Sequence, residues 1–388
     1  MAKAAAVYTK QSNSGDAGRE LGEEVRKQLP EGPPDALIVF ASARFDYVEL
    51  LTAIRDSCQP AIVVGSSSAG EYTGDQHGEG TACALAIRAP EMQFSVGVGR
   101  CVGQDRETAA RDVIGSFAGL NSHEYPYRAA LVMTDALAGH ADDLIEQLTL
   151  LTAAKYQFAG GGAGDDARFS RTHVFCGTEA YTDAVVALEM LSRKPLGVGV
   201  SHGWVPGSDV FRVTEARGMR VDSLNGLPAA EVFEEYALAT GQTFDRSQPL
   251  PFFLHNILGI QTGDGYRLRV PLSVDEQGAV LCAAEIPAGA SVRIMKTTNA
   301  SAVAAAEAAT SQAVKALGAG KPGAALFFDC VATRLRMGDV FGFELETVAR
   351  TLGGAQFIGC NTYGQIARGD GQFSGFHNCT AVLLVLPA

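Results

Sequence analysis

The chain has 388 residues, which is long enough for two or more domains that each bury a core. Hydrophobic residues make up 47% of it and charged residues 19%, a balance that excludes extensive disorder. Acidic residues outnumber basic ones, the formal net charge is −12, and no block of Lys or Arg occurs. We therefore expect neither nucleic acid nor an anionic membrane surface as a partner.

Cysteine spacing and the length of apolar runs indicate in which cellular compartment the protein is expected. The eight cysteines include no CxxC pair, which argues against a thiol-ligated zinc site, a disulfide framework and covalently attached haem. No apolar run approaches the roughly 18 residues that a membrane span needs, and the first residues do not read as a signal peptide. We expect a cytoplasmic protein with free thiols and no membrane partner.

One unit recurs three times along the chain. Each copy has an apolar run, a helix-like stretch and a second apolar run that ends in glycine, and a predicted helix precedes it. The three copies are segments 35–65, 128–160 and 323–359, and the preceding helices are 17–29, 104–117 and 301–317. The runs ALIVF, AALVM and AALFF are typical of buried strands. A strand–helix–strand order normally makes a right-handed parallel crossover, so we predict an α/β protein with mixed, largely parallel sheets.

A glycine-containing turn follows the second strand of each copy. In the first copy it lies within VVGSSSAGEY, residues 63–72. Offsets of 294 and 94 align Gly65, Ser68, Gly70 and Glu71 with Gly359, Thr362, Gly364 and Gln365, and with Ala159, Gly162, Gly164 and Asp165. Another strand follows each turn, so a strand–turn–strand junction is the favoured interpretation. The alternative is that the turns line one edge of a ligand pocket.

Catalysis at the serine-rich turn is disfavoured. A nucleophile elbow requires Gly-x-Ser-x-Gly followed by a helix, but Ser66 stands two residues before Ser68 and a strand follows. The GGGAG stretch at 160–164 lacks the Lys-Ser/Thr of a phosphate-binding loop. We therefore expect no enzyme, and an enzyme acting at this turn is a distant alternative.

Five motifs in order resemble the FIST family. They are VVGSSSAGEY, AGGGAGDDARF with THVFCG, VTEARGMRVDSLNGLPAAEVFEEY, FIGCNTYGQIA, and FHNCT. The resemblance runs from about residue 34 to 384 and implies a FIST N-like sensory domain over 1–220 and a FIST C-like domain over 221–388. The sequence departs from the commoner family pattern at Gln365, where Glu is frequent, and in the first turn, where Cys often replaces Ser.

The resemblance implies a small-ligand sensor of signal transduction. Stand-alone members include nitric-oxide-sensing haem proteins of the NosP type, which partner a histidine kinase. For this chain it implies haem b, nitric oxide as ligand, and output through a histidine kinase or a cyclic-dinucleotide enzyme. A haem iron needs an axial ligand, and the candidates are His202 first, then His377 and His255.

A sensor without haem is the alternative. Its ligand would be an amino acid or a similar small anion, whose carboxylate Arg334 or Arg336 would bind beyond the end of a strand. The remaining candidate contacts belong to the turns. They are Ser68, Glu71, Tyr363 and Gln365.

Overall fold

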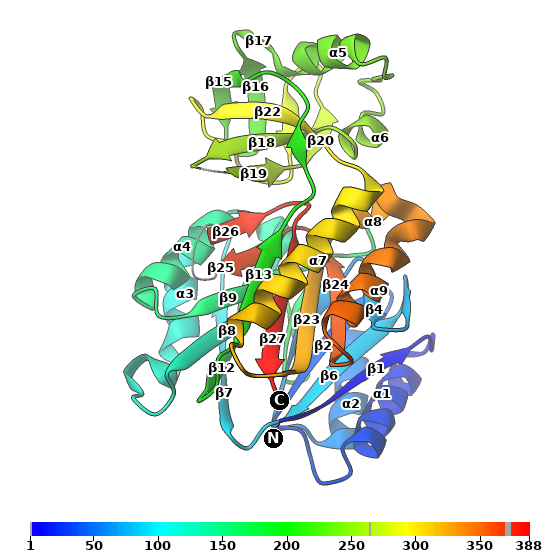
Figure 1. The fold of residues 1–388 in the computed structure, drawn as a ribbon, viewed down its shortest axis with the longest axis vertical. Coiled ribbons are helices and arrows are strands. Elements are labelled where there is room, and N and C mark those ends of the chain that lie inside the picture. The colour runs from blue at the N-terminus through cyan, green and yellow to red at the C-terminus, as the bar shows by residue number, and fades with distance from the viewer. Residues whose placement is uncertain (1, 264, 369–373) are drawn as a thin grey trace.

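A computed structural model describes residues 2–263, 265–368 and 374–388 (Figure 1). Figure 1 shows two bodies: a β-rich unit at the top, coloured green to yellow, and a larger body of helices and sheets below it. In the described residues the larger body contains three six-stranded sheets, and the upper unit is built on a nine-stranded sheet.

Three modules with the same order of elements form the larger body. The first consists of β1 (Lys3–Thr9), α1 (Ser14–Gln28), β2 (Ala36–Ser42), α2 (Tyr47–Cys58), β3 (Ile62–Ser68), β4 (Glu71–Thr73), β5 (His77–Gly78) and β6 (Ala82–Arg88). The second consists of β7 (Met92–Arg100), α3 (Arg106–Gly115), β8 (Tyr127–Thr134), α4 (Ala141–Leu151), β9 (Gln157–Gly162), β10 (Val174–Cys176), β11 (Glu179–Tyr181) and β12 (Ala184–Ser192). The third consists of β13 (Gly197–Ser201), α7 (Asn299–Ala316), β23 (Pro322–Cys330), α8 (Val331–Met337), α9 (Gly342–Thr351), β24 (Gln356–Thr362), β25 (Gln365–Arg368), β26 (Ser374–His377) and β27 (Ala381–Pro387).

The upper unit interrupts the third module between β13 and α7, and we call residues 205–296 the inserted domain. Its elements are β14 (Val205–Pro206), β15 (Phe211–Arg217), β16 (Arg220–Leu224), β17 (Leu227–Pro228), α5 (Ala229–Ala239), α6 (Leu250–Phe253), β18 (Ile257–Thr262), β19 (Gly265–Arg269), β20 (Pro271–Val274), β21 (Val280–Cys282) and β22 (Ser291–Lys296). It has its own apolar core, in which Phe233 and Phe253 are fully buried.

One buried arginine ties the inserted domain to the larger body. The guanidinium of Arg269 in β19 donates to the carboxylate of Asp142 in α4 and, at 3.1 Å, to the carbonyl oxygen of Phe376 in β26. It also donates to the carbonyl oxygens of Leu268 and Glu285, each at 2.9 Å. Since its side chain is only 1% exposed, these acceptors compensate for the loss of water around the charge.

The predicted α/β architecture with mixed sheets is confirmed. The strand orders β1-β6-β2-β3, β7-β12-β8-β9 and β13-β27-β23-β24 are equivalent. Each contains one parallel pair, namely β2 with β3, β8 with β9 and β23 with β24. The parallel share is smaller than we predicted. Strands β6, β12 and β27 each pair antiparallel with the strands on both sides, which are β1 and β2, β7 and β8, and β13 and β23.

Each module also lends strands to a neighbour, which closes a ring. Strand β4 joins the sheet of the third module, where Glu71 lies opposite Cys360. Strand β25 of the third joins the sheet of the second, with Gln365 opposite Gly161, and β10 of the second joins the sheet of the first. The three modules are therefore held together by backbone hydrogen bonds as well as by apolar packing.

Strand register corrects one alignment made from the sequence. Gly65 pairs with Val39, Gly160 with Val132 and Gly359 with Phe327. At Gly65 a Cβ would lie 1.8 Å from the carbonyl oxygen of Val39, and at Gly160 one would lie 1.9 Å from that of Val132, so only glycine fits. The offset between the first and second copies is therefore 95 rather than 94, and Glu71 corresponds to Asp166. The glycine run at 160–162 hid the correct register.

Candidate functional site

The three glycine turns meet one another at the centre of the ring. The N–H of Ala69 donates to the carbonyl oxygen of Asn361 at 2.9 Å, and that of Gly164 donates to Ser67 at 3.0 Å. The N–H of Tyr363 donates to the carbonyl oxygen of Gly162 at 3.0 Å. Ala69, Gly164 and Tyr363 are equivalent under the corrected offsets, so the turns form a cyclic set of hydrogen bonds that joins the modules.

Within the first turn and within the third, polar side chains form a similar set of hydrogen bonds. The hydroxyl of Ser68 donates to the buried carboxylate of Glu71, whose other oxygen accepts from the N–H and hydroxyl of Thr81 at 3.2 and 2.6 Å. Burial raises the pKa of Glu71 to about 7. In the third turn, Gln365 donates to the hydroxyl of Thr362 at 2.8 Å and accepts from the N–H of Thr380 at 3.2 Å. Ser68, Glu71 and Gln365 therefore serve the turns, and none of them lines the two large cavities described next.

A cavity of about 400 Å³ lies between the inserted domain and the second and third modules, and we call it the apolar cavity. Its walls are mostly aliphatic or aromatic. The modules contribute Ala136, Leu137, Phe169, Val331, Ala332, Leu335 and Tyr363, and the inserted domain contributes Met219, Leu250, Leu254, Val270, Leu272 and Leu281. The module residues follow β8, β9, β23 and β24, so the cavity sits beyond the carboxyl ends of the parallel strands, where α/β sheets commonly bind ligands.

Few polar groups reach the apolar cavity. Asn378 is buried, and its Oδ1 accepts from the N–H of Val270 at 3.3 Å. Tyr363 donates its hydroxyl hydrogen bond to Asp165, and its ring stacks on Phe169 with 4.2 Å between centroids. Burial and the contact with Asp165 raise the pKa of Tyr363. The tyrosine therefore presents a neutral ring to the cavity.

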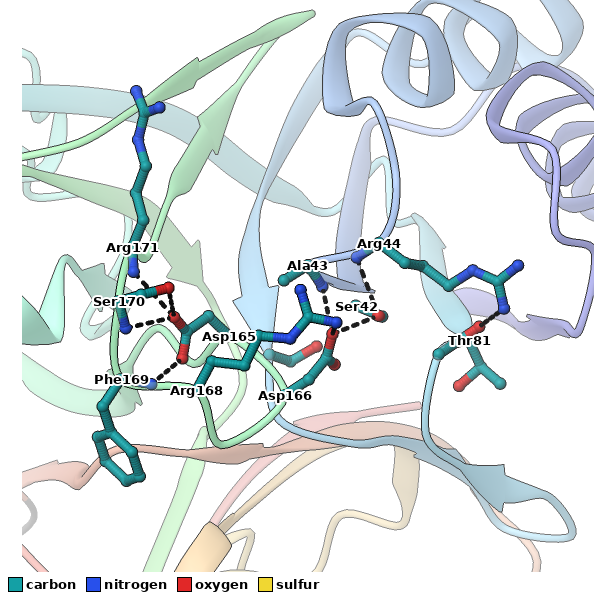
Figure 2. A network of polar contacts seen from close by, with 12 residues as sticks. Ser42, Ala43, Arg44, Thr81, Asp165, Asp166, Arg168, Phe169, Ser170 and Arg171 are labelled. Atoms are coloured by element: carbon teal, nitrogen blue, oxygen red, sulfur yellow. Dashed lines mark hydrogen bonds and ion pairs between the residues drawn. The ribbon is translucent and has the colours of Figure 1, made fainter.

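Residues 165–171 form a loop that contains Asp165, the hydrogen-bond partner of Tyr363, and several residues in strained backbone conformations. Figure 2 shows the carboxylate of Asp165 accepting from the N–H groups of Phe169, Ser170 and Arg171, at 2.8, 2.7 and 2.8 Å. Burial opposes ionisation, yet the hydrogen bonds from Tyr363 and from these N–H groups hold the pKa of Asp165 below its usual range. Phe169 has a φ of 52°, and two further non-glycine residues of the loop also have positive φ. Such clustered strain is typical of functional loops.

The same loop contributes to a second cavity of about 380 Å³, which we call the polar cavity. Its lining includes Asp46 and Tyr47 at the start of α2 together with Asp165, Arg168, Ser170, Arg171 and His173. Within the described part of the chain, the hydroxyl of Tyr47 and Nδ1 of His173 are buried without a hydrogen-bond partner. Phe169 lines the apolar cavity, so one loop borders two chemically different cavities.

The three candidate haem ligands lie elsewhere. His202 places Nε2 3.2 Å from the carbonyl oxygen of Tyr266, and its Nδ1 accepts from the N–H of Trp204 at 3.3 Å. His377 is buried in β26, where burial lowers its pKa to about 3. His255 is exposed just after α6. None of the three lines either of the two large cavities.

The two candidate arginines on α8 also line neither cavity. Arg334 pairs with Glu79, and Arg336 donates to Oδ1 of Asn299 at 2.8 Å while its guanidinium lies 5.8 Å from the ring centre of Trp204. Leu335 between them lines the apolar cavity. The sequence reasoning missed this leucine because an apolar residue beside a strand end reads as ordinary core. Its place on α8, the helix that begins directly after the buried strand β23, was the available signal.

Two further features follow from the described residues. No group of three or more His, Cys, Asp or Glu side chains among them is placed to hold a metal ion. No helix among them has the length and apolar character needed to cross a membrane. The geometry therefore defines a three-module α/β protein with two ligand-sized cavities.

Two protein-family models match the chain. The FIST N domain matches residues 35–227 and the FIST C domain matches residues 229–368, so the chain belongs to the FIST family. FIST domains are sensory domains of signal transduction that bind small ligands. The junction between the two matches falls inside the inserted domain, immediately before α5.

Other comparisons add little. No curated protein matches the chain. A cyanuric acid hydrolase from A. caulinodans is 8% identical, with 99% of each chain covered and a TM-score of 0.32. A second cyanuric acid hydrolase structure is 9% identical, with 100% of each chain covered and a TM-score of 0.29. These scores are too low to carry an argument about fold or function.

Proposed function

We propose that this FIST protein senses a small, largely apolar molecule that binds in the apolar cavity and signals through a separate protein. The observation that carries the proposal is the cavity itself, about 400 Å³ with apolar walls, at the junction of two bodies. Its volume lies within the range of roughly 300–1,000 Å³ that small-molecule sites occupy. Burying about 200 Å² of apolar ligand surface there would contribute on the order of 5 kcal/mol.

The location of the cavity supports a signalling role. A ligand held by Leu254 and Leu272 of the inserted domain and by Val331 and Leu335 of the third module contacts both bodies at once. It therefore favours whichever relative arrangement of the two makes both sets of contacts, which shifts a conformational population. A histidine kinase or a cyclic-dinucleotide enzyme that recognises this arrangement would supply the output.

Haem is not part of this proposal. Both large cavities lack His202, His255 and His377 in their linings, and a haem iron held by histidine needs an imidazole aimed at the iron. The linings of these two cavities therefore do not fit a haem b held by one of these histidines, and we derive no nitric-oxide step.

A second candidate ligand is favoured by the polar cavity. Arg168 and Arg171 line it together with Asp46, which suits the carboxylate and ammonium groups of an amino acid. This would place the anion at these arginines rather than at Arg334 or Arg336. An amino acid that raises the melting temperature of the wild type, but not of Arg171→Met, would support it. Arg217→Met, an exposed change in the inserted domain, is the matched control.

The main proposal is tested with the neutral fluorescent probe N-phenyl-1-naphthylamine. We expect saturable binding to the wild type and at least about tenfold weaker binding to Ala332→Phe, which fills the cavity. Ala239→Phe makes the same substitution at an exposed position outside the cavity and should bind as the wild type does. Equal affinity in all three proteins would overturn the proposal. An absorbance spectrum after expression with haem supplied tests the haem hypothesis separately.

A further inference from the structure

Two buried cysteines meet at the edge of the apolar cavity. Cys330 ends β23 and lines the cavity, while Cys379 lies just before β27. Antiparallel pairing of β23 with β27 places Phe328 opposite Val382, which brings position 330 beside Thr380, the neighbour of Cys379. Both residues belong to one cluster of packed apolar side chains, and each thiol shifts the pKa of the other, so the two side chains are near neighbours.

We propose that Cys330 and Cys379 are a redox modification site that a small hydroperoxide converts into a disulfide. The register puts Cys379 one residue from the position that faces Cys330, on a chain segment that leaves regular strand geometry at Cys379, where φ is 49°. Both side chains are almost fully buried from bulk water, at 3% and 5% exposed, so the cavity is the route by which a small oxidant reaches Cys330.

The pair is chemically asymmetric. Cys330 lines the cavity and Cys379 does not, so a small oxidant reaches Cys330 first and Cys379 resolves the intermediate. The pKa shifts agree with this order, because the neighbouring Cys379 holds the pKa of the Cys330 thiol below its usual range, whereas the same contact and burial raise the pKa of Cys379. Cys379 also has a φ of 49°, an unusual conformation for a residue other than glycine.

The chemistry balances with a hydroperoxide as the only added reactant. The Cys330 thiolate attacks the peroxide, the O–O bond breaks, and the leaving oxygen departs as water or an alcohol after taking a proton. Cys330 is then a sulfenic acid. The sulfur of Cys379 attacks that of Cys330, the S–O bond breaks, and water leaves with the thiol proton. The two thiols lose two electrons and the peroxide gains them, and a dithiol reductant reverses the change.

The site does not depend on the proposed ligand. Disulfide formation joins the start of α8, whose residues Val331 and Ala332 line the cavity, to the start of β27. In a reducing compartment a disulfide of this kind is transient, which is typical of catalytic or redox-sensing pairs. The sulfur chemistry is measured directly, so its failure would be distinguishable from failure of the ligand proposal.

Peptide mapping gives a direct test. Native protein is treated with stoichiometric hydrogen peroxide, its thiols are blocked, and it is digested with trypsin under non-reducing conditions. Segments 316–334 and 369–388 each contain a single cysteine, so a cross-link between them identifies the Cys330–Cys379 disulfide. We expect this species in the wild type, its loss on dithiothreitol treatment, and its retention in Cys282→Ser, which removes another cysteine of the same cavity.

Two single variants test the order of events. Cys379→Ser should accumulate a sulfenic acid that dimedone traps on Cys330, whereas Cys330→Ser should give no dimedone adduct on Cys379. The wild-type map needs no variant, so it stands even if a substitution impairs folding. The exposed Cys101 shows that the oxidant was active. Oxidation of Cys101 without any cross-link between 330 and 379 in the wild type would overturn the proposal.

Discussion

The hydroxyl of Tyr363 donates a hydrogen bond to the carboxylate of Asp165, joining the turn of the third module to the loop of the second. The two residues are 198 positions apart in sequence, and both are buried. Tyr363 lines the apolar cavity and Asp165 lines the polar cavity. This hydrogen bond therefore links a residue in the wall of one cavity to a residue in the wall of the other.

Removing that hydrogen bond should destabilise the protein measurably. Tyr363→Phe keeps the stack on Phe169 but leaves the buried carboxylate with fewer donors, so we expect a loss of about 1–3 kcal/mol in the free energy of unfolding. Urea denaturation followed by circular dichroism measures it. Tyr127→Phe, at a residue 41% exposed, is the control and should change stability by less than about 0.5 kcal/mol. Equal losses in the two variants would show that the contact contributes nothing.

Glu71 should make stability depend on pH. Its pKa in the folded protein is about 7 against a usual 4.5, so between these values the folded state binds more protons than the unfolded state. Its contribution to stability is full below pH 4.5 and falls as the pH rises to 7, by on the order of 3 kcal/mol.

Glu71→Gln removes the titrating group and copies the amide that Gln365 already provides in the third turn. We expect the difference in unfolding free energy between variant and wild type to move in favour of the variant from pH 4.5 to pH 7. Chemical denaturation across that window measures it. A difference that is flat with pH would mean that Glu71 does not titrate there.

The glycines that pair with the middle of the parallel strands should tolerate no side chain. In Gly160→Ala the new Cβ would overlap the carbonyl oxygen of Val132, so the strands must separate and we expect a loss of at least about 3 kcal/mol. Gly115→Ala, near the end of α3, meets nothing within 4 Å and should be neutral or stabilising by up to about 1 kcal/mol. Thermal unfolding of the two variants distinguishes these outcomes, and similar melting temperatures would contradict the register.

Replacing Arg269 by lysine should destabilise the protein far more than replacing its neighbour Arg267 by lysine. Lysine cannot reproduce the forked contacts to Asp142 and Phe376, so Arg269→Lys should cost about 2 kcal/mol or more and speed hydrogen exchange in β19. The side chain of Arg267 is 35% exposed and lies 3.5 Å from the same carboxylate. Arg267→Lys should therefore lower the free energy of unfolding by less than about 0.5 kcal/mol. Equal losses of unfolding free energy in the two variants would mean that the buried contacts of Arg269 do not help to hold the inserted domain on the larger body.

The repeated modules could be predicted from the sequence because buried strands such as Leu326–Phe328 and alanine-rich helices leave local patterns. The inserted domain was visible only as a region that broke the repeat. The exchange of strands among modules, by which Glu71 lies opposite Cys360, leaves no local signal, since it depends on pairing across hundreds of residues.

The candidate site was harder to predict than the fold. Histidines and arginines were chosen as binding residues for their chemistry, yet Val331 and Leu335 line the cavity. An apolar side chain in a wall looks the same in sequence as one in a core, and only packing distinguishes them. Tyr363 was the one predicted contact that reaches the apolar cavity.

The strand exchange has a consequence for synthesis of the protein. Strand β4 pairs with β24, and β9 pairs with β25, so both β4 and β9 lack these partners until residues 356–368 have been synthesised. Exposed edges of this kind recruit other chains. We therefore expect a product that ends before β24 to aggregate more readily than one that contains both strands.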